Sequence, residues 1–223
     1  MEIFIDSANV TEIEKWLNMG IADGVTTNPS IMLSDGAYDM ETGARDIARL
    51  IHPRPLSVEV TTNDLDEMIV QAKKFASWAP NIVIKIPQET QDGVPCYGVI
   101  HQLESQGIKV NATVVLSFGQ VILAAKAGAT YISIFAGRIG DEGGNPNEII
   151  NQSVEWLRHW DFKSRIIVGS IRSVADILQA ALAGADIITI PPQFLGKMAD
   201  HKYTRETVRQ FVADARKAME KRR

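Results

Sequence analysis

The chain has 223 residues, 45% of them hydrophobic and 22% charged, which suits one large domain over residues 1–223 with a well-buried core. The net charge of −4 and the scattered positive residues argue against a nucleic-acid-binding face, and no apolar run reaches membrane-spanning length. We therefore expect neither a nucleic-acid nor a membrane partner. A single cysteine, Cys96, excludes an internal disulfide and a cysteine metal cluster, so we expect a cytoplasmic protein with no metal.

Short apolar, β-rich segments recur along the chain, and each precedes a segment whose apolar residues are spaced as in a helix. Eight such pairs follow one another at even spacing. This alternation is typical of parallel β-α units. The strands are predicted at residues 3–6, 24–27, 56–60, 82–86, 109–114, 131–135, 165–170 and 186–190.

Amphipathic helices are predicted between these strands, where they would form an outer coat. Their apolar residues fall three and four positions apart. A last helix, residues 204–221, follows the eighth strand and would cover either the barrel or a neighbouring subunit. The clearest of the connecting helices are predicted at residues 10–17, 64–78, 147–160 and 174–182.

Helix ends are marked by residues with special backbone or side-chain properties. Gly20, Gly107, Gly128 and Gly184 follow helical segments, and glycine adopts the left-handed conformation that ends many helices. Ser173 precedes V-A-D-I-L and is a predicted N-cap, because its hydroxyl can accept from a free backbone N–H of the first turn.

Eight parallel strands joined by right-handed crossovers predict a (β/α)8 TIM barrel with an additional C-terminal helix. A doubly wound open sheet is the alternative. It usually has fewer strands and often a glycine-rich nucleotide loop after the first strand, whereas this first strand runs into I-D-S-A-N. The barrel is therefore the preferred fold.

Lys85 interrupts the apolar strand I-V-I-K-I-P, where both faces should be buried. Lysine is seldom fully buried without a reason. A desolvated amine becomes neutral more readily and can then attack a carbonyl carbon. The alternative is a structural ion pair with Asp6 or Glu59 inside the barrel.

Asp6 and Glu59 stand at the ends of the first and third strands, where the loops of such a barrel converge on one mouth. Carboxylates placed there can carry protons if burial favours their neutral form. The alternative role of an acidic residue at such a position is a helix cap, and Asp6 in particular could cap the helix that begins near Val10.

Arg138, Ser170 and Arg172 follow the sixth and seventh strands, the part of such barrels that often binds phosphate. A guanidinium group matches a tetrahedral oxyanion, and backbone N–H groups near Ser173 would add to the field. Surface salt bridges are the alternative for a single arginine. Two arginines and a serine at one mouth favour an anion site.

Seven stretches occur in an order that resembles the small transaldolase family, which includes fructose-6-phosphate aldolase. They are I-F-I-D-S-A-N, G-V-T-T-N-P-S, S-V-E-V, V-I-K-I-P, N-A-T, S-I-F-A-G-R-I and G-S-I-R. The resemblance extends from Glu2 to the helix after Thr204. T-T-N-P-S and K-I-P are its most specific parts.

The resemblance implies a class I aldol mechanism that needs no metal and no organic cofactor. Lys85 would attack the ketose carbonyl, and Asp6 would take the proton of the C4 hydroxyl as the C3–C4 bond breaks. A dihydroxyacetone enamine would remain on Lys85 and attack an aldose acceptor. The alternative from another functional class is a binding protein, a barrel that binds an anion and catalyses no reaction.

The resemblance also implies roles for the residues around Lys85. Glu59 and Thr113 would hold the water that exchanges protons during formation and hydrolysis of the Schiff base. The expected ligands of the sugar hydroxyls and the triose unit are Thr27, Asn28, Asn111 and Ser133, and those of the terminal anion are Arg138, Ser170 and Arg172.

Two residues separate the branches of this family. The aldolase branch, which releases free dihydroxyacetone, has Gln at the position of Glu59 and Tyr at the position of Phe135. Both differences point to a transaldolase, because an apolar ring would keep the enamine dry for transfer. Simple aldol cleavage remains the alternative activity.

This chain also departs from the usual pattern of the family. Segment 88–99 is longer than the usual link after the lysine strand, and Gly169 and Ser173 replace the usual alanine and asparagine. These changes lie near the expected anion end of the substrate. The resemblance therefore implies anionic sugars as partners, either sugar phosphates or sulfonated sugars, and a homo-oligomer that is a decamer or smaller.

Overall fold

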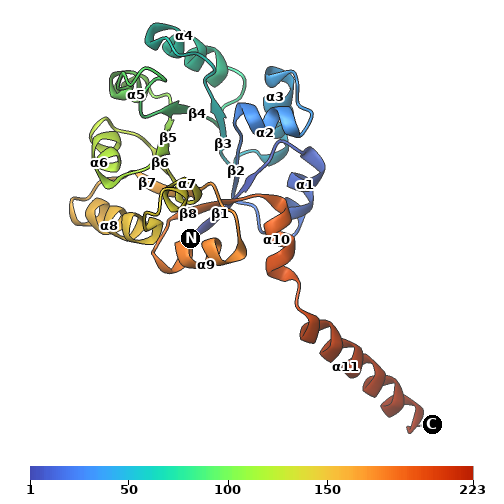
Figure 1. Cartoon of the computed structure of the whole chain (residues 1–223). Helices are drawn as coiled ribbons and strands as arrows, with labels where there is room; N and C mark the ends of the chain where they lie inside the picture. Colours follow the sequence, from blue (N-terminus) through green and yellow to red (C-terminus); the bar gives the residue numbers. More distant parts are fainter. Residues whose placement is uncertain (223) are drawn as a thin grey trace.

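A closed barrel of eight parallel strands forms the centre of the computed structural model, which describes residues 1–222 (Figure 1). Each strand pairs with the next along the chain, and the last pairs with the first, Glu2 opposite Ile187. The (β/α)8 prediction is confirmed, and the open-sheet alternative is wrong. The strands are β1 (Glu2–Asp6), β2 (Gly24–Thr26), β3 (Leu56–Glu59), β4 (Ile82–Pro87), β5 (Val110–Val115), β6 (Tyr131–Phe135), β7 (Arg165–Gly169) and β8 (Ile187–Ile190).

Helices surround the barrel, and Figure 1 shows them as a ring around the strands. None of the helices within residues 1–222 is both long and apolar enough to cross a lipid bilayer. The helices are α1 (Val10–Asn18), α2 (Pro29–Ser34), α3 (Met40–Ile51), α4 (Leu65–Ala76), α5 (Tyr97–Ser105), α6 (Phe118–Lys126), α7 (Ala136–Asp141), α8 (Pro146–His159), α9 (Val174–Leu182), α10 (Pro192–Ala199) and α11 (Lys202–Glu220).

The two faces of the strands have different partners, because successive side chains of a strand point to opposite sides. Outward residues such as Ile5, Ile84 and Val168 pack against the helices in one large apolar core. Inward apolar residues form a separate, smaller cluster. It consists of Phe4, Val83, Tyr131, Ile167 and Ile187.

The ring of Phe4 explains the glycine at the start of β2. Gly24 is the register partner of Phe4, and a Cβ atom at Gly24 would lie 2.7 Å from that ring. The Phe4 ring meets the Tyr131 ring edge to face, with centroids 6.3 Å apart. The interior cluster is therefore closely packed, and the polar inward residues lie further along the strands, toward their carboxyl ends.

The strand predictions are accurate at this level: each of the eight differs from the observed strand by at most one residue at either end. Gly20, Gly107, Gly128 and Gly184 all have φ between 72° and 95°, as expected of helix stops. Ser173 caps α9 and forms a capping box with Asp176. These local predictions are confirmed.

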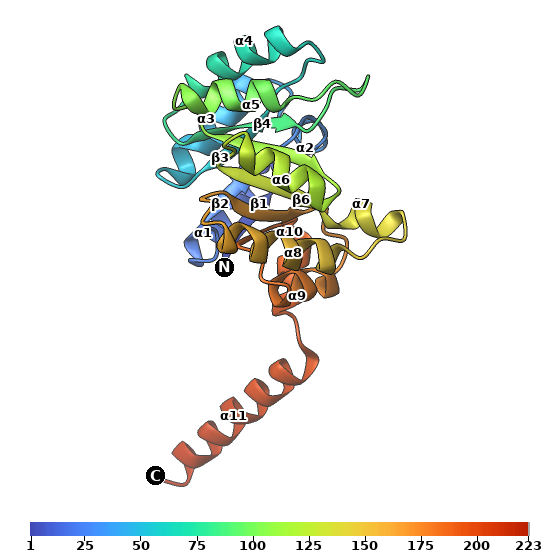
Figure 2. The ribbon, with the colours of Figure 1, turned by 90° about the vertical axis from the view of Figure 1, so that its left-hand side faces the viewer.

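The final helix does not cover its own barrel. It was predicted at residues 204–221 and is observed as α11 (Lys202–Glu220), which extends away from the other helices (Figures 1 and 2). None of its residues is buried. The prediction that it covers the barrel is therefore wrong for this chain taken alone.

Candidate functional site

A cavity of about 400 Å³ lies at the carboxyl ends of the strands, as predicted for the barrel mouth. Lys85 lines it, together with residues from the ends of six other strands or the connections that follow them. The structure thus brings together most of the predicted set. The predicted residues that line this cavity are Asp6, Asn28, Glu59, Lys85, Phe135, Arg138 and Ser170.

Lys85 is buried, with 4% of its surface exposed, and its amine has two partners. Nζ donates to the Thr27 carbonyl oxygen at 3.0 Å and lies 3.1 Å from Glu59 Oε2. Glu59 is the register neighbour of Lys85 on β3, so the pairing of two strands sets this contact. The amine is held in a fixed place, and a carboxylate within hydrogen-bond distance can exchange a proton with it.

Asp6 occupies the end of β1, next to Thr26 at the end of β2. The Thr26 hydroxyl donates to Asp6 Oδ1 at 2.7 Å and also hydrogen-bonds the Thr189 hydroxyl. Burial raises the pKa of Asp6 above 3.8, although the charge of Lys85 and the Thr26 hydrogen bond act in the opposite direction. Asp6 does not cap α1, because that cap is Asn9. The carboxylate is thus free to act in the mouth.

A polar layer crosses the barrel interior beside Lys85. Asn111 is fully buried; its amide donates to Ser57 Oγ at 3.2 Å, and its carbonyl oxygen accepts from Ser133 Oγ at 2.8 Å. The Thr27 hydroxyl donates to the Ser57 carbonyl oxygen at 2.8 Å. Asn111 and Ser133 therefore hydrogen-bond each other, and Asn111 and Thr27 both bond to Ser57, which holds these side chains in defined orientations.

Thr113 lies next to an irregularity in β5. The register with β6 shifts between Ala112 and Val115, and Val114 has φ of 57°, which is uncommon for a β-branched residue. The Thr113 hydroxyl is buried and lacks a hydrogen-bond partner, as does the Gln88 amide oxygen. The Gln88 amide nitrogen donates to the Thr113 carbonyl oxygen at 3.3 Å. Neither residue is among those that line the cavity around Lys85.

The long connection after β4 is an ordered hairpin. Glu89 and Pro95 form an antiparallel bridge, and the side chain of Asn63 donates to Asp92 at 2.8 Å. In Figure 2 this connection extends at the same end of the barrel as α7. The segment 88–99, which the sequence singled out for its length, therefore borders the mouth.

Two of the three predicted anion ligands line the cavity. Arg138 is exposed and makes no ion pair with any residue in the range 1–222, so its charge is available. Ser170 has φ of 58°, and its carbonyl oxygen accepts from the Gly137 backbone at 3.1 Å. A Cβ atom at Gly137 would lie 2.2 Å from that oxygen. The absence of a side chain at Gly137 allows α7 and the β7–α9 connection to approach.

Arg172, which was also predicted as an anion ligand, is not among the residues that line this cavity. Its guanidinium group forms two hydrogen bonds of 2.6 Å with Asp141, the last residue of α7. The backbone N–H groups of Arg172 and Ser173 both donate to Asp176, at 2.9 Å each. The amides that were expected to strengthen the anion field are therefore already paired.

Asn28 also has a structural role. Its side-chain oxygen caps α2 by accepting from the Ile31 backbone at 2.9 Å, which leaves its amide group for a ligand.

Within residues 1–222 there is no group of three or more His, Cys, Asp or Glu side chains placed to hold a metal ion.

Three inward residues next to the site were not among the candidates. Thr26, Ser57 and Thr189 each hydrogen-bond a predicted residue or its direct partner. All three are buried. Their signal in the sequence is the same as that of Lys85, a polar residue inside an otherwise apolar strand.

Known proteins resemble this chain over almost its whole length. The family model described as transaldolase/fructose-6-phosphate aldolase matches residues 3–223. A protein named "Probable transaldolase" from Lactiplantibacillus plantarum is 42% identical over 96% of both chains. Another with the same name, from Syntrophobacter fumaroxidans, is 40% identical over 100% of both.

A solved structure, thiamine phosphate pyrophosphorylase from Pyrococcus furiosus, superposes with a TM-score of 0.58 over 85% of both chains at 14% identity. At that identity it supports the barrel fold alone. The family match over residues 3–223 and the relatives of similar length are more specific. The chain therefore belongs to the transaldolase/fructose-6-phosphate aldolase family.

Proposed function

We propose that the protein is a transaldolase that moves a dihydroxyacetone unit from a ketose with a terminal anion to an aldose phosphate, through a Schiff base on Lys85. The observation that carries this proposal is a buried amine with one carboxylate at 3.1 Å and a second, Asp6, in the same cavity. The names of the relatives agree with this activity.

The first half of the reaction needs a neutral amine and a proton carrier. As Lys85 attacks the ketose carbonyl, Glu59 accepts the ammonium proton across the 3.1 Å contact and returns it to the departing water. Thr113 offers its unpartnered hydroxyl to this water. The product is an iminium ion at C2 of the donor.

Cleavage and transfer follow at Asp6. The carboxylate takes the proton of the C4 hydroxyl as the C3–C4 bond breaks, and an aldose leaves. The electron pair of the broken C3–C4 bond forms the enamine on Lys85. The enamine then attacks the acceptor aldehyde, and Asp6 returns the proton to the new hydroxyl. Water finally hydrolyses the imine, so the proton and the water are both balanced over one cycle.

The donor is oriented by the polar layer and by the anion group. Thr27, Asn28, Asn111 and Ser133 are the proposed ligands of the hydroxyls of the triose unit and the sugar chain. Arg138 and Ser170 hold the terminal anion, which is the phosphate of fructose 6-phosphate or sedoheptulose 7-phosphate, or the sulfonate of 6-deoxy-6-sulfofructose. One arginine in the cavity suits either anion.

Transfer is favoured over simple cleavage by Phe135, whose apolar ring lines the cavity. An apolar neighbour offers no hydrogen bond to water that would protonate the enamine. Donor consumption should therefore stop after one turnover without an acceptor aldose. Continued turnover without an acceptor would indicate an aldolase.

Borohydride trapping tests the Schiff base directly. Incubation with fructose 6-phosphate and borohydride should attach a reduced triose or hexose fragment to Lys85, and mass spectrometry of the digested protein identifies the modified lysine. The matched control is Lys109, which precedes β5 and lies outside the cavity. No adduct, or an adduct on another lysine, would contradict the mechanism.

The assembly proposed for this enzyme is a homo-oligomer, a decamer or smaller, of one-domain subunits spanning residues 1–223. An amphipathic helix with no buried residue supports it: Val208, Phe211 and Val212 of α11 are all exposed. Sedimentation of the full chain and of a chain ending at Ala199 tests the assembly.

A lone free cysteine supports a reducing, cytoplasmic location.

A further inference from the structure

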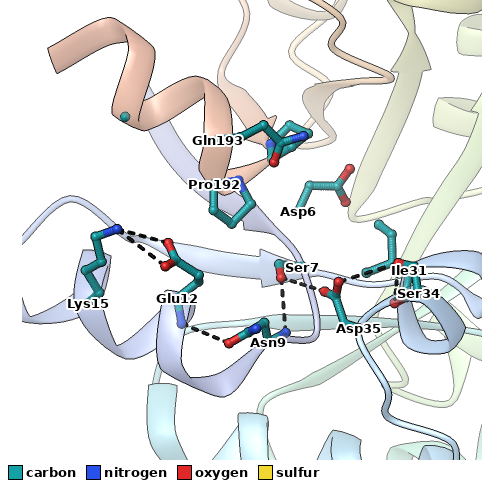
Figure 3. A pocket seen from close by; sticks show the side chains of 12 residues that line it. Asp6, Ser7, Asn9, Glu12, Lys15, Ile31, Ser34, Asp35, Pro192 and Gln193 are labelled. Carbon is teal, nitrogen blue, oxygen red and sulfur yellow. Dashed lines mark hydrogen bonds and ion pairs between the residues drawn. The ribbon is translucent and has the colours of Figure 1, made fainter. Parts of the chain in front are cut away.

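A second cavity, of about 600 Å³, lies beside Asp6 (Figure 3). Its walls come from the connection after β1, from α1, from α2 and from α10. Asp6 lines both this cavity and the one that contains Lys85. Groups around the second cavity can therefore act on Asp6 without being part of the Lys85 cavity.

One carboxylate in the second cavity holds the chain that leaves Asp6. Asp35, which follows α2, accepts from the Ser7 hydroxyl at 2.7 Å and from the Ala8 backbone at 2.8 Å. The Ser7 hydroxyl in turn accepts from the Asn9 backbone at 3.0 Å. Figure 3 shows this chain of contacts running from Asp35 through Ser7 to Asn9. Ser7 and Ala8 are thus held directly by Asp35, and Asn9 is held through Ser7.

Asp35 is also a charge near Asp6. The side chain of Asp35 is exposed to solvent. The other groups that act on Asp6 are the cation of Lys85, the carboxylate of Glu59 and the hydroxyl of Thr26. Burial is the main reason that the pKa of Asp6 is raised, and the negative charges of Asp35 and Glu59 raise it further.

We propose that Asp35 is a positioning residue for Asp6: its carboxylate fixes the loop that leaves β1 and presents a negative charge to the catalytic carboxylate. This inference rests on the proposed role of Asp6 as the base of C3–C4 cleavage. Asp35 has no contact with Lys85 among the hydrogen bonds of residues 1–222. It should therefore affect cleavage and not the formation of the Schiff base.

Single-turnover kinetics with fructose 6-phosphate separates these two steps. Borohydride quenching measures the Lys85 adduct, and released glyceraldehyde 3-phosphate measures cleavage, each as a function of pH. Asp35→Asn should leave adduct formation within about twofold and slow cleavage about tenfold, because a neutral amide oxygen accepts the Ser7 and Ala8 hydrogen bonds less strongly than a carboxylate and so positions Asp6 less well. The acid limb of its pH–rate profile for cleavage should move to lower pH, because one negative charge that raises the pKa of Asp6 is lost.

Companion variants separate the charge from the contacts. Asp35→Glu keeps the charge, and Ser7→Ala keeps Asp35 but removes the 2.7 Å contact, so both should slow cleavage without moving the acid limb. Glu12→Gln is the matched control, because Glu12 lines the same cavity, pairs with Lys15 and should leave both steps unchanged.

Three outcomes would overturn the inference. Asp35→Asn could cleave at the wild-type rate with an unmoved acid limb, or it could slow both steps equally, which would indicate general loosening. If Asp35→Asn does not fold, the inference is contradicted when Ser7→Ala and Asp35→Glu both cleave at the wild-type rate. A wild-type protein that forms no adduct on Lys85 would instead contradict the proposed function.

Discussion

Replacing Gly137 by alanine tests how closely α7 must approach the anion group. The added Cβ would lie 2.2 Å from the Ser170 carbonyl oxygen and 2.8 Å from both Ser170 Oγ and Arg172 Nε. Ordinary van der Waals contact begins near 3.4 Å, so the two segments must separate by about 1 Å. The variant therefore moves Ser170 relative to Arg138.

The stability effect follows from this displacement. Overpacking costs about 1–3 kcal/mol, and loss of the 3.1 Å hydrogen bond from Gly137 to Ser170 costs about 1 kcal/mol. Thermal unfolding, followed by circular dichroism, should show a Tm lower by about 5–12 °C for a chain of this size. Gly140→Ala on the same helix is the control, because no heavy atom lies within 4 Å of its Cβ.

The kinetic effect should concern the anionic donor. Displacing the Ser170 hydroxyl weakens a hydrogen bond to a charged group, which corresponds to a rise in KM for fructose 6-phosphate of about tenfold. Trapping of Lys85 with free dihydroxyacetone, which has no terminal anion, should change little. If Gly137→Ala has the same Tm and KM as Gly140→Ala, the close contact between Gly137 and Ser170 limits neither stability nor binding of the donor.

Three further changes test other parts of the site. Lys85→Met should remove transfer and the borohydride adduct, with activity at least about 10⁴-fold lower in a coupled assay, because no other amine lines the cavity within residues 1–222. Thr26→Val removes a hydrogen bond that lowers the pKa of Asp6, so the acid limb of the pH–rate profile should move to higher pH. Asp141→Asn should change the unfolding free energy by less than about 1 kcal/mol, since its pair with Arg172 is half exposed. Binding assays should show a lower Kd for the anionic donor in this variant, because it frees a positive charge beside the mouth.

The barrel and the centre of the site were predictable because both depend on local patterns. Strand ends converge in a closed parallel barrel, so Asp6, Glu59 and Lys85 had to share one mouth once the strands were located. Thr26 and Thr189 follow the same rule, although no role was predicted for either. A polar residue inside an apolar strand needs a partner, and in a barrel that partner is another inward residue.

The orientation of Arg172 could not be predicted from its position. It follows β7 at the expected place, but its partner Asp141 lies 31 residues earlier, on a helix whose approach depends on Gly137. Whether an exposed arginine contacts a substrate anion or a carboxylate such as Asp141 depends on loop geometry. No periodicity in the sequence encodes that geometry. For the same reason the contact between Asp35 and Ser7 is a finding of the structure alone.

The environment of Asp6 suits a group that must take a proton in one half-reaction and return it in the other. Burial favours the neutral acid, and the charges of Asp35 and Glu59 act in the same direction, whereas Lys85 and the Thr26 hydroxyl favour the carboxylate. A carboxylate held only by Lys85 would be a weak base, and one surrounded only by apolar groups would stay protonated. In the proposed mechanism Lys85 carries no charge once the neutral enamine has formed, so the balance at Asp6 should move toward the protonated acid at that stage. Asp6 would then hold the proton that the new hydroxyl needs when the acceptor arrives.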